Sequence, residues 1–127
     1  MASGYPDWQG WPGRSAGGES MLAYSFSGAI ASGVTGTVVL PVVAVGYENI
    51  YQNITISCND DTAIHTLNLI RVGDAWVFFR LNFITGGIYD FPGQAIVAGA
   101  TVRIDITNNS AAVKTFEGVI NYVVRKI

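Results

Sequence analysis

From residue 21 onward the chain is a series of short runs of β-branched and aromatic residues, separated by clusters of Gly, Asn and Asp. The clearest run is TVRIDIT, in which Val102, Ile104 and Ile106 alternate with polar residues. Alternation with a period of two places the apolar side chains on one face of a β-strand. The run NITISC at 53–58 has the same alternation. No stretch has the period of an amphipathic helix, so we predict an all-β chain.

The predicted strands are Leu22 to Ile30, Thr37 to Val45, Ile50 to Cys58, Ile64 to Val72, Trp76 to Phe83, Ala95 to Ala98, Thr101 to Thr107 and Phe116 to Arg125. Short strands with turn residues between them are typical of an antiparallel β-sandwich or a small barrel. A set of about eight favours a jelly roll. The predicted fold is therefore all-β: an antiparallel, jelly-roll-like β-sandwich of about eight strands, with an extended N-terminal arm.

The connections between these strands carry turn residues. NDDT at 59–62, VGDA at 72–75 and NNSA at 109–112 tolerate positive φ angles or cap turns with their own side chains. We therefore expect successive strands to be antiparallel hairpin neighbours. Pro41 interrupts an otherwise smooth run and predicts an edge strand or a bulge there.

Two predicted strands are apolar on both faces: WVFFRLNF at 76–83 and VINYVV at 119–124. A strand with one face in water should alternate between apolar and polar residues. Such strands either lie in the middle of a packed sandwich or meet a neighbouring molecule with their outer face.

The N-terminal stretch MASGYPDWQGWPGRSAGGES has a different character, and we assign residues 1–20 to an extended arm and 21–127 to the sandwich domain. Gly and Pro at this density break helix and strand alike, so the arm cannot shelter its aromatic rings by folding on itself. We expect Tyr5, Trp8 and Trp11 to anchor the arm on a partner surface, with Arg14 as a polar clamp. The alternative is that the arm folds back over its own sandwich.

Composition indicates an oligomer. Charged residues make up 13% of the 127 residues and hydrophobic ones 50%, whereas ordinary soluble domains carry about 25% charged residues. A surface poor in charge suits a permanent contact with other subunits. The formal net charge of −2, with Lys and Arg scattered, lacks the basic footprint of a nucleic-acid partner. The longest apolar run, VVLPVVAV, is too short to span a membrane.

The sequence contains no local catalytic motif, and we predict neither enzymatic activity, nor catalytic residues, nor a metal or cofactor. His65 is expected to be a structural histidine and Cys58 a plain buried thiol. Asp60 and Asp61 offer oxygen ligands, but a calcium site needs more carboxylates around them, so we expect an ordinary hairpin tip. The lone cysteine and the absence of a leader-like N-terminus favour folding in a cytoplasm.

Aromatic rings on a sandwich can also stack on sugars. The candidates for such a ligand platform are Trp76, Tyr89 and Phe91, with Asp74 and Asp90 as polar companions. The competing interpretation is that Trp76 packs in or near the core, because it begins an apolar strand.

The segments ITISCNDDTAIHTLNLIRVG, TGGIYDFPGQ and IVAGATVRIDITNNSAAVKTFEGVINYVV resemble, in their strand rhythm, the small β-sandwich modules of tailed-bacteriophage virion proteins. Gly99 and the run Glu117-Gly118-Val119 with Tyr122 match that pattern, whereas Ala100 stands where Gly-Asp is more usual. The arm has no counterpart in it.

The resemblance implies a virion structural protein assembled in the host cytoplasm. We expect a capsid decoration (cement) protein, a homotrimer that binds the major capsid protein or another virion subunit. The alternative is a tail or baseplate adhesion module that binds host carbohydrate.

Overall fold

The computed structural model describes residues 20–60, 62–91, 95–97 and 101–127, and the regular elements in these ranges are strands. The strands are β1 (Ser20–Ile30), β2 (Thr35–Val39), β3 (Tyr47–Cys58), β4 (His65–Val72), β5 (Trp76–Phe83), β6 (Gly86–Asp90), β7 (Ala95–Val97), β8 (Thr101–Thr107) and β9 (Lys114–Lys126). No helix in the described part of the chain is long and apolar enough to cross a membrane.

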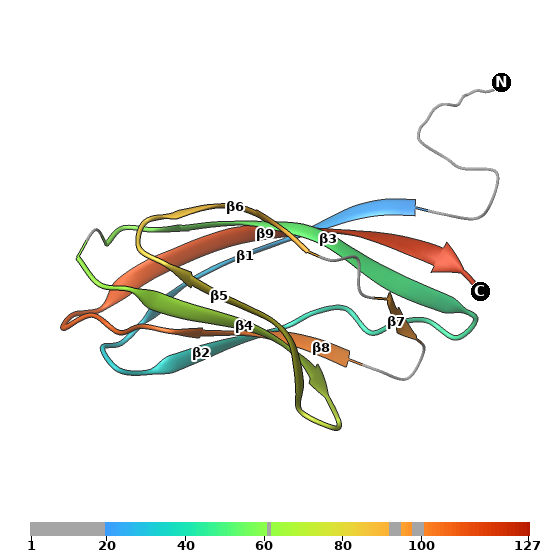
Figure 1. The fold of residues 1–127 in the computed structure, drawn as a ribbon, viewed down its shortest axis with the longest axis horizontal. Helices are drawn as coiled ribbons and strands as arrows, with labels where there is room; N and C mark the ends of the chain where they lie inside the picture. The colour runs from blue at the N-terminus through green and yellow to red at the C-terminus, as the bar shows by residue number, and fades with distance from the viewer. Residues whose placement is uncertain (1–19, 61, 92–94, 98–100) are drawn as a thin grey trace, which may run out of the picture.

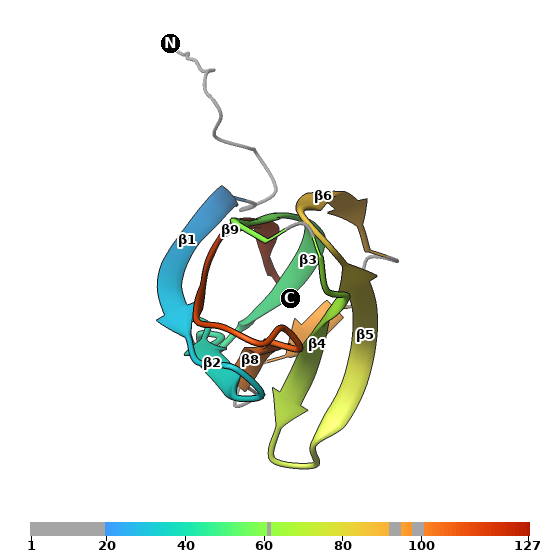
Figure 2. The ribbon, with the colours of Figure 1, turned by 90° about the vertical axis from the view of Figure 1, so that its left-hand side faces the viewer.

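The strands form two antiparallel sheets that face each other (Figures 1 and 2). We call them sheet A, with the order β1-β9-β3-β6 and β7 also paired to β3, and sheet B, with the order β2-β8-β4-β5. Apart from β4–β5 and β6–β7, consecutive strands lie in opposite sheets, which is the jelly-roll arrangement. The predicted all-β sandwich is confirmed.

The expectation that successive strands are hairpin neighbours was wrong for most of the chain. Of the three turn motifs, only the VGDA turn joins two paired strands, β4 and β5. The turns at 59–62 and 109–112 instead carry the chain from one sheet to the other. The residues that cap a hairpin turn also satisfy a crossing loop, so turn chemistry alone does not say which strands pair.

The core lies between the sheets and follows the predicted alternation. Val102, Ile104 and Ile106 of β8 are buried, as are Ile54 and Ile56 of β3. The buried core cluster comprises Leu40, Val43, Tyr51, Ile54, Ile56, Leu67, Leu69, Phe83, Val102, Ile104, Ile106, Phe116, Ile120 and Tyr122.

The two strands that are apolar on both faces take different positions in the sandwich. β9 lies in the middle of sheet A, between β1 and β3. β5 is an edge strand of sheet B, and its register shifts so that Leu69 pairs with Phe79 while Ile70 pairs with Val77. The shift leaves Phe78 as an extra residue, a β-bulge, and both Phe78 and Phe79 pack against the core.

Several strand bounds shift by one to three residues from the prediction, and two elements differ more. β2 ends at Val39, and the segment after it, which contains Pro41, is not a strand although it buries Leu40 and Val43. β6 was not predicted, because it begins with two glycines. Gly86 has φ 119°, and a Cβ there would lie 2.0 Å from the backbone oxygen of Ile56. Only glycine lets β6 approach β3 so closely.

The connections at one end of the sandwich, which we call the loop end, are 31–34, 59–60 with 62–64, 84–85 and 108–113. The registers place them together, since Ile30 is opposite Lys114, Ser57 is opposite Gly86 and His65 is opposite Phe83. In Figure 1 this end is at the left, and the C-terminus lies at the opposite end.

Candidate interaction site

The predicted arm anchors Tyr5, Trp8, Trp11 and Arg14 lie outside the described residues. β1 begins at Ser20, which pairs with Val124 near the end of β9. Ser20 therefore lies at the end of the molecule opposite the loop end.

The loop end carries exposed aliphatic side chains. Each of its four connections contributes one: Val34 is 48% exposed, Ile64 60%, Ile84 43% and Val113 62%. Among the described residues of these loops only Asp60 is charged, and it is buried. The end thus presents aliphatic groups with little charge, as the centre of a protein interface does.

A buried amide holds these loops in place. The side chain of Asn108 is fully buried, and its Nδ2 donates to the carbonyl oxygens of Ile30 at 2.7 Å and Ala112 at 2.9 Å. Its Oδ1 accepts from the backbone N–H of Ser110 at 2.9 Å and from the Ser110 hydroxyl at 2.7 Å. The backbone of Asn108 also bonds to Val34 and Gly33. One residue thus fastens the β8–β9 loop to the β1–β2 loop.

A second buried network joins the β3–β4 loop to the β8–β9 loop, because Nδ1 of His65 accepts the backbone N–H of Asn109. His65 and Asp60 are both buried, and Nε2 of His65 lies 2.8 Å from Oδ2 of Asp60. Oδ1 of Asp60 accepts from the hydroxyl of Thr62 at 2.8 Å and from its backbone N–H at 3.1 Å, and Nζ of Lys114 lies 3.7 Å away. Asp60 therefore belongs to a satisfied buried network, which corrects the expectation of an ordinary hairpin tip; Asp61 lies outside the described residues.

The Thr62 hydroxyl contributes most to holding the pKa of Asp60 well below its usual range. The Thr62 N–H, the His65 ring and Lys114 add to this effect, while burial opposes it. Asp60 is therefore a carboxylate in the folded protein across the physiological pH range.

The Cys58 thiol lies 3.8 Å from Nε2 of His65, so the structure brings a Cys, a His and an Asp together. A catalytic relay needs one ring nitrogen free for the nucleophile and the other oriented by a third group. Here Nδ1 accepts the backbone N–H of Asn109 at 3.2 Å, so Nε2 carries the proton and donates it to Asp60. Nε2 has no lone pair left for the thiol, and burial raises the pKa of Cys58. The arrangement is a structural one.

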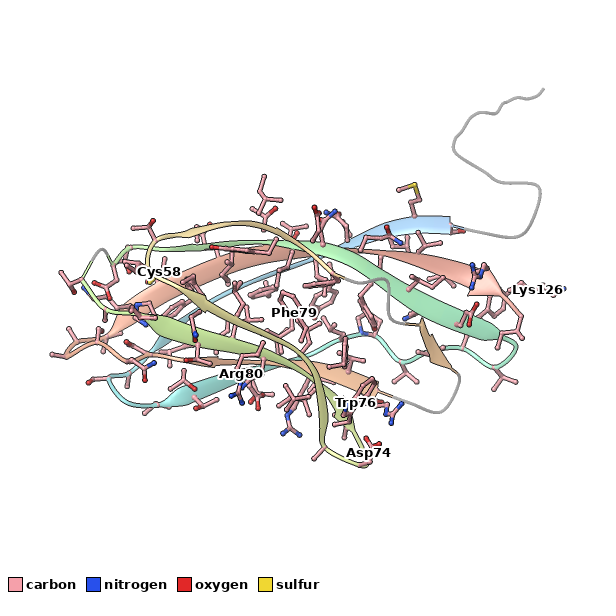
Figure 3. All side chains as sticks on the ribbon, in the orientation of Figure 1. Cys58, Asp74, Trp76, Phe79, Arg80 and Lys126 are labelled. Atoms are coloured by element: carbon pink, nitrogen blue, oxygen red, sulfur yellow. The ribbon has the colours of Figure 1, made fainter. Side chains whose placement is uncertain are left out.

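Trp76 lies toward the other end of the molecule, beside the β4–β5 hairpin (Figure 3). It is 41% exposed, its ring lies 4.8 Å from the guanidinium carbon of Arg71, and it contacts Phe78 at 5.7 Å between ring centroids. Arg71 also binds Asp74, with Nη2 and Oδ2 2.5 Å apart, and this guanidinium lowers the pKa of the Asp74 carboxyl.

The other candidates of the sugar platform have a different setting. Tyr89 and Phe91 are partly buried against the core, and the Phe91 ring packs on Phe79 at 4.5 Å between centroids. Asp90, between them, is exposed. The rings of Tyr89, in β6, and Phe91, directly after it, thus contribute to the core, while Trp76 is exposed at the hairpin.

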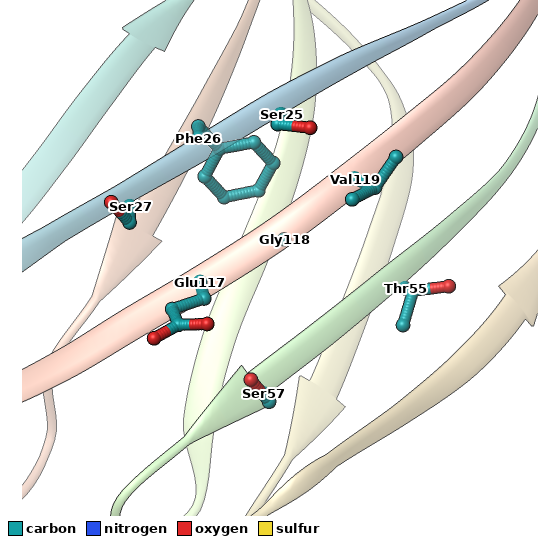
Figure 4. Close-up of a pocket in the computed structure, with 8 residues that line it drawn as sticks. All are labelled: Ser25, Phe26, Ser27, Thr55, Ser57, Glu117, Gly118 and Val119. Atoms are coloured by element: carbon teal, nitrogen blue, oxygen red, sulfur yellow. The ribbon is translucent and has the colours of Figure 1, made fainter.

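The outer face of sheet A has a shallow depression of about 550 Å³ (Figure 4). Small polar side chains line it: Ser25 and Ser27 of β1, Thr55 and Ser57 of β3, with Glu117 of β9. Within the described ranges, no group of three or more His, Cys, Asp or Glu side chains could hold a metal ion.

The fold has counterparts among solved structures. A chain from the structure titled "Cyanophage Pam1 capsid asymmetric unit" aligns with a TM-score of 0.55 and 19% sequence identity, covering 97% of this chain and 96% of that one. The likeness is one of fold. A chain from a study of Bacillus endospore appendages, described as disulfide-linked pili, aligns with a TM-score of 0.45 and 13% identity over 94% of this chain and 99% of that one. No family model and no curated protein sequence matches the chain.

Proposed function

We propose that this protein is a non-enzymatic structural protein of a bacteriophage virion, of the capsid decoration (cement) type. The observation that carries the proposal is the fold likeness to a chain of a cyanophage capsid asymmetric unit, which extends over 97% of this chain and 96% of that one. Because the jelly-roll fold serves many functions, the proposal also rests on the surface of this chain.

The loop end supplies a surface suited to docking. Val34, Ile64 and Val113 project from loops that the Asn108 and Asp60 networks already hold, and Ile84 projects from the loop that the backbone bond from Cys58 N–H to the Thr85 carbonyl holds. Because those loops are ordered before binding, little conformational entropy is lost when the aliphatic side chains are covered by a capsid subunit. Desolvating this surface costs little as well, because the described loop residues expose no charge.

The arm supplies a second attachment. Tyr5, Trp8 and Trp11 would anchor it on a neighbouring virion subunit, with Arg14 as a polar clamp. Large aromatic side chains are the residues that most often dominate the energy of such contacts. In an oligomer, for which we propose a homotrimer, several arms and several loop ends bind the same shell, so weak single contacts add up to durable attachment.

The arrangement of the one histidine supports a non-enzymatic role. Both ring nitrogens of His65 are engaged, by Asn109 and by Asp60, and its side chain is fully buried. The protein would act by adding buried area across capsid subunit junctions.

Labelling of virions tests the proposal directly. An antibody raised against residues 20–127 is bound to virions from the source of this sequence and located by immunogold electron microscopy. We expect gold over the heads. Gold confined to the tail or baseplate would replace the decoration role with the adhesion alternative, in which the exposed Trp76 is the ring left to stack on a sugar. Virions that carry no label, in a preparation where a capsid antibody does label, would overturn the proposal.

A further inference from the structure

β1 is an edge strand whose second edge has no partner in the described part of the chain. It pairs with β9 along its whole length, from Ser20 opposite Val124 to Ile30 opposite Lys114, without a register shift. Its 11 residues, SMLAYSFSGAI, include no charged residue and no proline. Such an edge presents unpaired backbone groups to which another strand can bond.

The other three sheet edges are protected. β2 has 5 residues and is followed by Pro41. β5 is interrupted by the bulge at Phe78 and carries the exposed Arg80. β6 has 5 residues and begins with two glycines. Short strands, bulges, prolines and charges are the devices by which proteins prevent edge-to-edge pairing. β1 has none of them, so its edge is suited to a partner strand.

We propose that β1 pairs antiparallel with β1 of a second copy of this chain across a two-fold axis. Ser25 is the middle residue of β1, and a two-fold axis there places Ser25 opposite Ser25 and pairs all 11 residues. Sheet A of one copy then continues into sheet A of the next. Strand addition of this kind gains its affinity from backbone hydrogen bonds.

The side chains fit this register. It sets Tyr24 opposite Phe26 and the larger residues Leu22 and Met21 opposite Gly28 and Ala29 respectively. Met21 is 82% exposed and Leu22 46% exposed in the single chain. A Cβ at Gly28 would meet nothing within 4 Å, so the space in front of this glycine is open to a side chain. No pair in this register brings like charges together.

A cavity opens beside the same edge. It has a volume of about 160 Å³ and lies between β1 and β2, where the two sheets are not joined. Phe26, Ile30 and Ile106 contribute to its apolar lining, and Gly28 borders it. Leu22 shares a strand face with Tyr24 and Phe26, which pack against the core. In the two-fold register, Leu22 of the second copy is opposite Gly28 and covers this cavity.

Introducing a charge at the two-fold axis tests the proposal. In the full chain, Ser25→Lys or Ser25→Glu each place like charges opposite each other, and Ser25 is exposed, so the single chain should fold normally. We expect each variant to halve the solution mass measured by light scattering, from a dimer to a monomer or, where separate contacts form the homotrimer proposed above, from a pair of trimers to one trimer. Mixing the two variants pairs Lys with Glu and should restore the wild-type mass.

Asn82→Lys, on the exposed face of β5 at the far edge of sheet B, is the matched control and should leave the mass unchanged. A mass that neither Ser25 variant lowers would overturn the proposal, and that result would also be found if the arm of the same chain, or another protein, occupied the β1 edge. A halved mass that mixing does not restore would overturn it as well, because the two copies would then not meet at residue 25.

Discussion

The imidazole of His65 donates its Nε2 proton to the Asp60 carboxylate over 2.8 Å, and both side chains are buried. Asp60 lies two residues beyond the end of β3 in sheet A, and His65 is the first residue of β4 in sheet B. The rings of Phe116 and Phe83 lie 5.0 and 5.6 Å from the imidazole. The pair therefore fixes the point at the loop end where the chain passes from one sheet to the other.

Low pH should lower the free energy of unfolding because of the pKa shift of Asp60. The Thr62 hydroxyl and the other donors lower the pKa of Asp60 in the folded chain, whereas the unfolded chain has the ordinary value of about 3.9. Below that pH the unfolded state binds a proton that the folded state does not bind. The stabilisation is therefore complete above about pH 4 and is lost as the pH falls toward the folded pKa.

Urea unfolding at a series of pH values measures this loss. We expect the wild-type free energy of unfolding to fall between about pH 4 and pH 2.5 more steeply than that of Asp60→Asn. At neutral pH the variant should already be the less stable protein. Parallel pH profiles for the two proteins would show that Asp60 is not the group responsible.

The amide of Asn108 should be required for stability. Asn108→Ala removes the donors to the Ile30 and Ala112 carbonyls and the acceptor for Ser110, all at a buried site. We expect a loss of about 3 kcal/mol in the free energy of unfolding, because buried polar groups are left without partners. The neighbouring Asn109→Ala is the control: its exposed side chain makes one bond, to the Ile64 carbonyl, and should cost less than about 1 kcal/mol. Equal losses in the two variants would contradict the role given to Asn108.

Much of the sandwich could be predicted from the sequence, because alternation is a local property. Val102, Ile104 and Ile106 face the core as their spacing indicates. Strand pairing could not be predicted in the same way. Asn59 and Asn108 have the side chains of hairpin turns, yet their hydrogen bonds join different strands of the sandwich, to Thr115 and to Ile30. A polar side chain in a loop indicates that a hydrogen-bond partner is needed, but the sequence does not identify that partner.

The candidate surfaces were harder to predict than the core. Val34, Ile64, Ile84 and Val113 are far apart in the chain and belong to no periodic pattern. They come together only because the jelly roll brings four connections to one end. The open edge of β1 is hidden for the same reason, since a sequence does not state which strand is last in its sheet. Both features result from the topology of the sandwich, which the local spacing of residues in the sequence does not indicate.

Gly118 should be intolerant of any side chain. It lies between Phe26 of β1 and Ile56 of β3 in the sheet register. A Cβ there would be 2.4 Å from Cζ of Phe26 and 2.9 Å from the Thr55 backbone oxygen. The phenyl ring covers this glycine, so Gly118→Ala would displace it. We expect a loss of about 2 kcal/mol in the free energy of unfolding.

Thermal and urea unfolding at low protein concentration measure the effect of Gly118→Ala. Gly28→Ala is the control, because a Cβ there meets nothing within 4 Å, and it should leave the unfolding of the single chain nearly unchanged. Adding Phe26→Ala to Gly118→Ala relieves the ring contact but not the contact with the Thr55 backbone. An unchanged stability in Gly118→Ala would contradict the prediction, because both the ring and the Thr55 backbone would then have to move aside freely.

The arm and the loop end should act in attachment rather than in folding. The deletion should remove residues 1–19 and keep Ser20, which is the first residue of β1. We expect this deletion to leave the melting temperature unchanged and to abolish binding to undecorated capsid shells in a co-sedimentation assay. Within the full chain, Trp8→Ala and Trp11→Ala should each weaken binding by about 30-fold, as loss of an aromatic anchor typically does.

For the loop end, the test is Ile64→Ser combined with Val113→Ser. Both side chains are more than half exposed, so the sandwich should fold normally while the aliphatic surface is lost. We expect weaker binding to the shells, with Asn82→Ser on the outer face of sheet B as a control that binds like the wild type. A fall in melting temperature on deletion of residues 1–19 would instead place the arm on its own sandwich. Attachment would then depend on the loop end, and the double variant Ile64→Ser with Val113→Ser should by itself abolish binding to the shells.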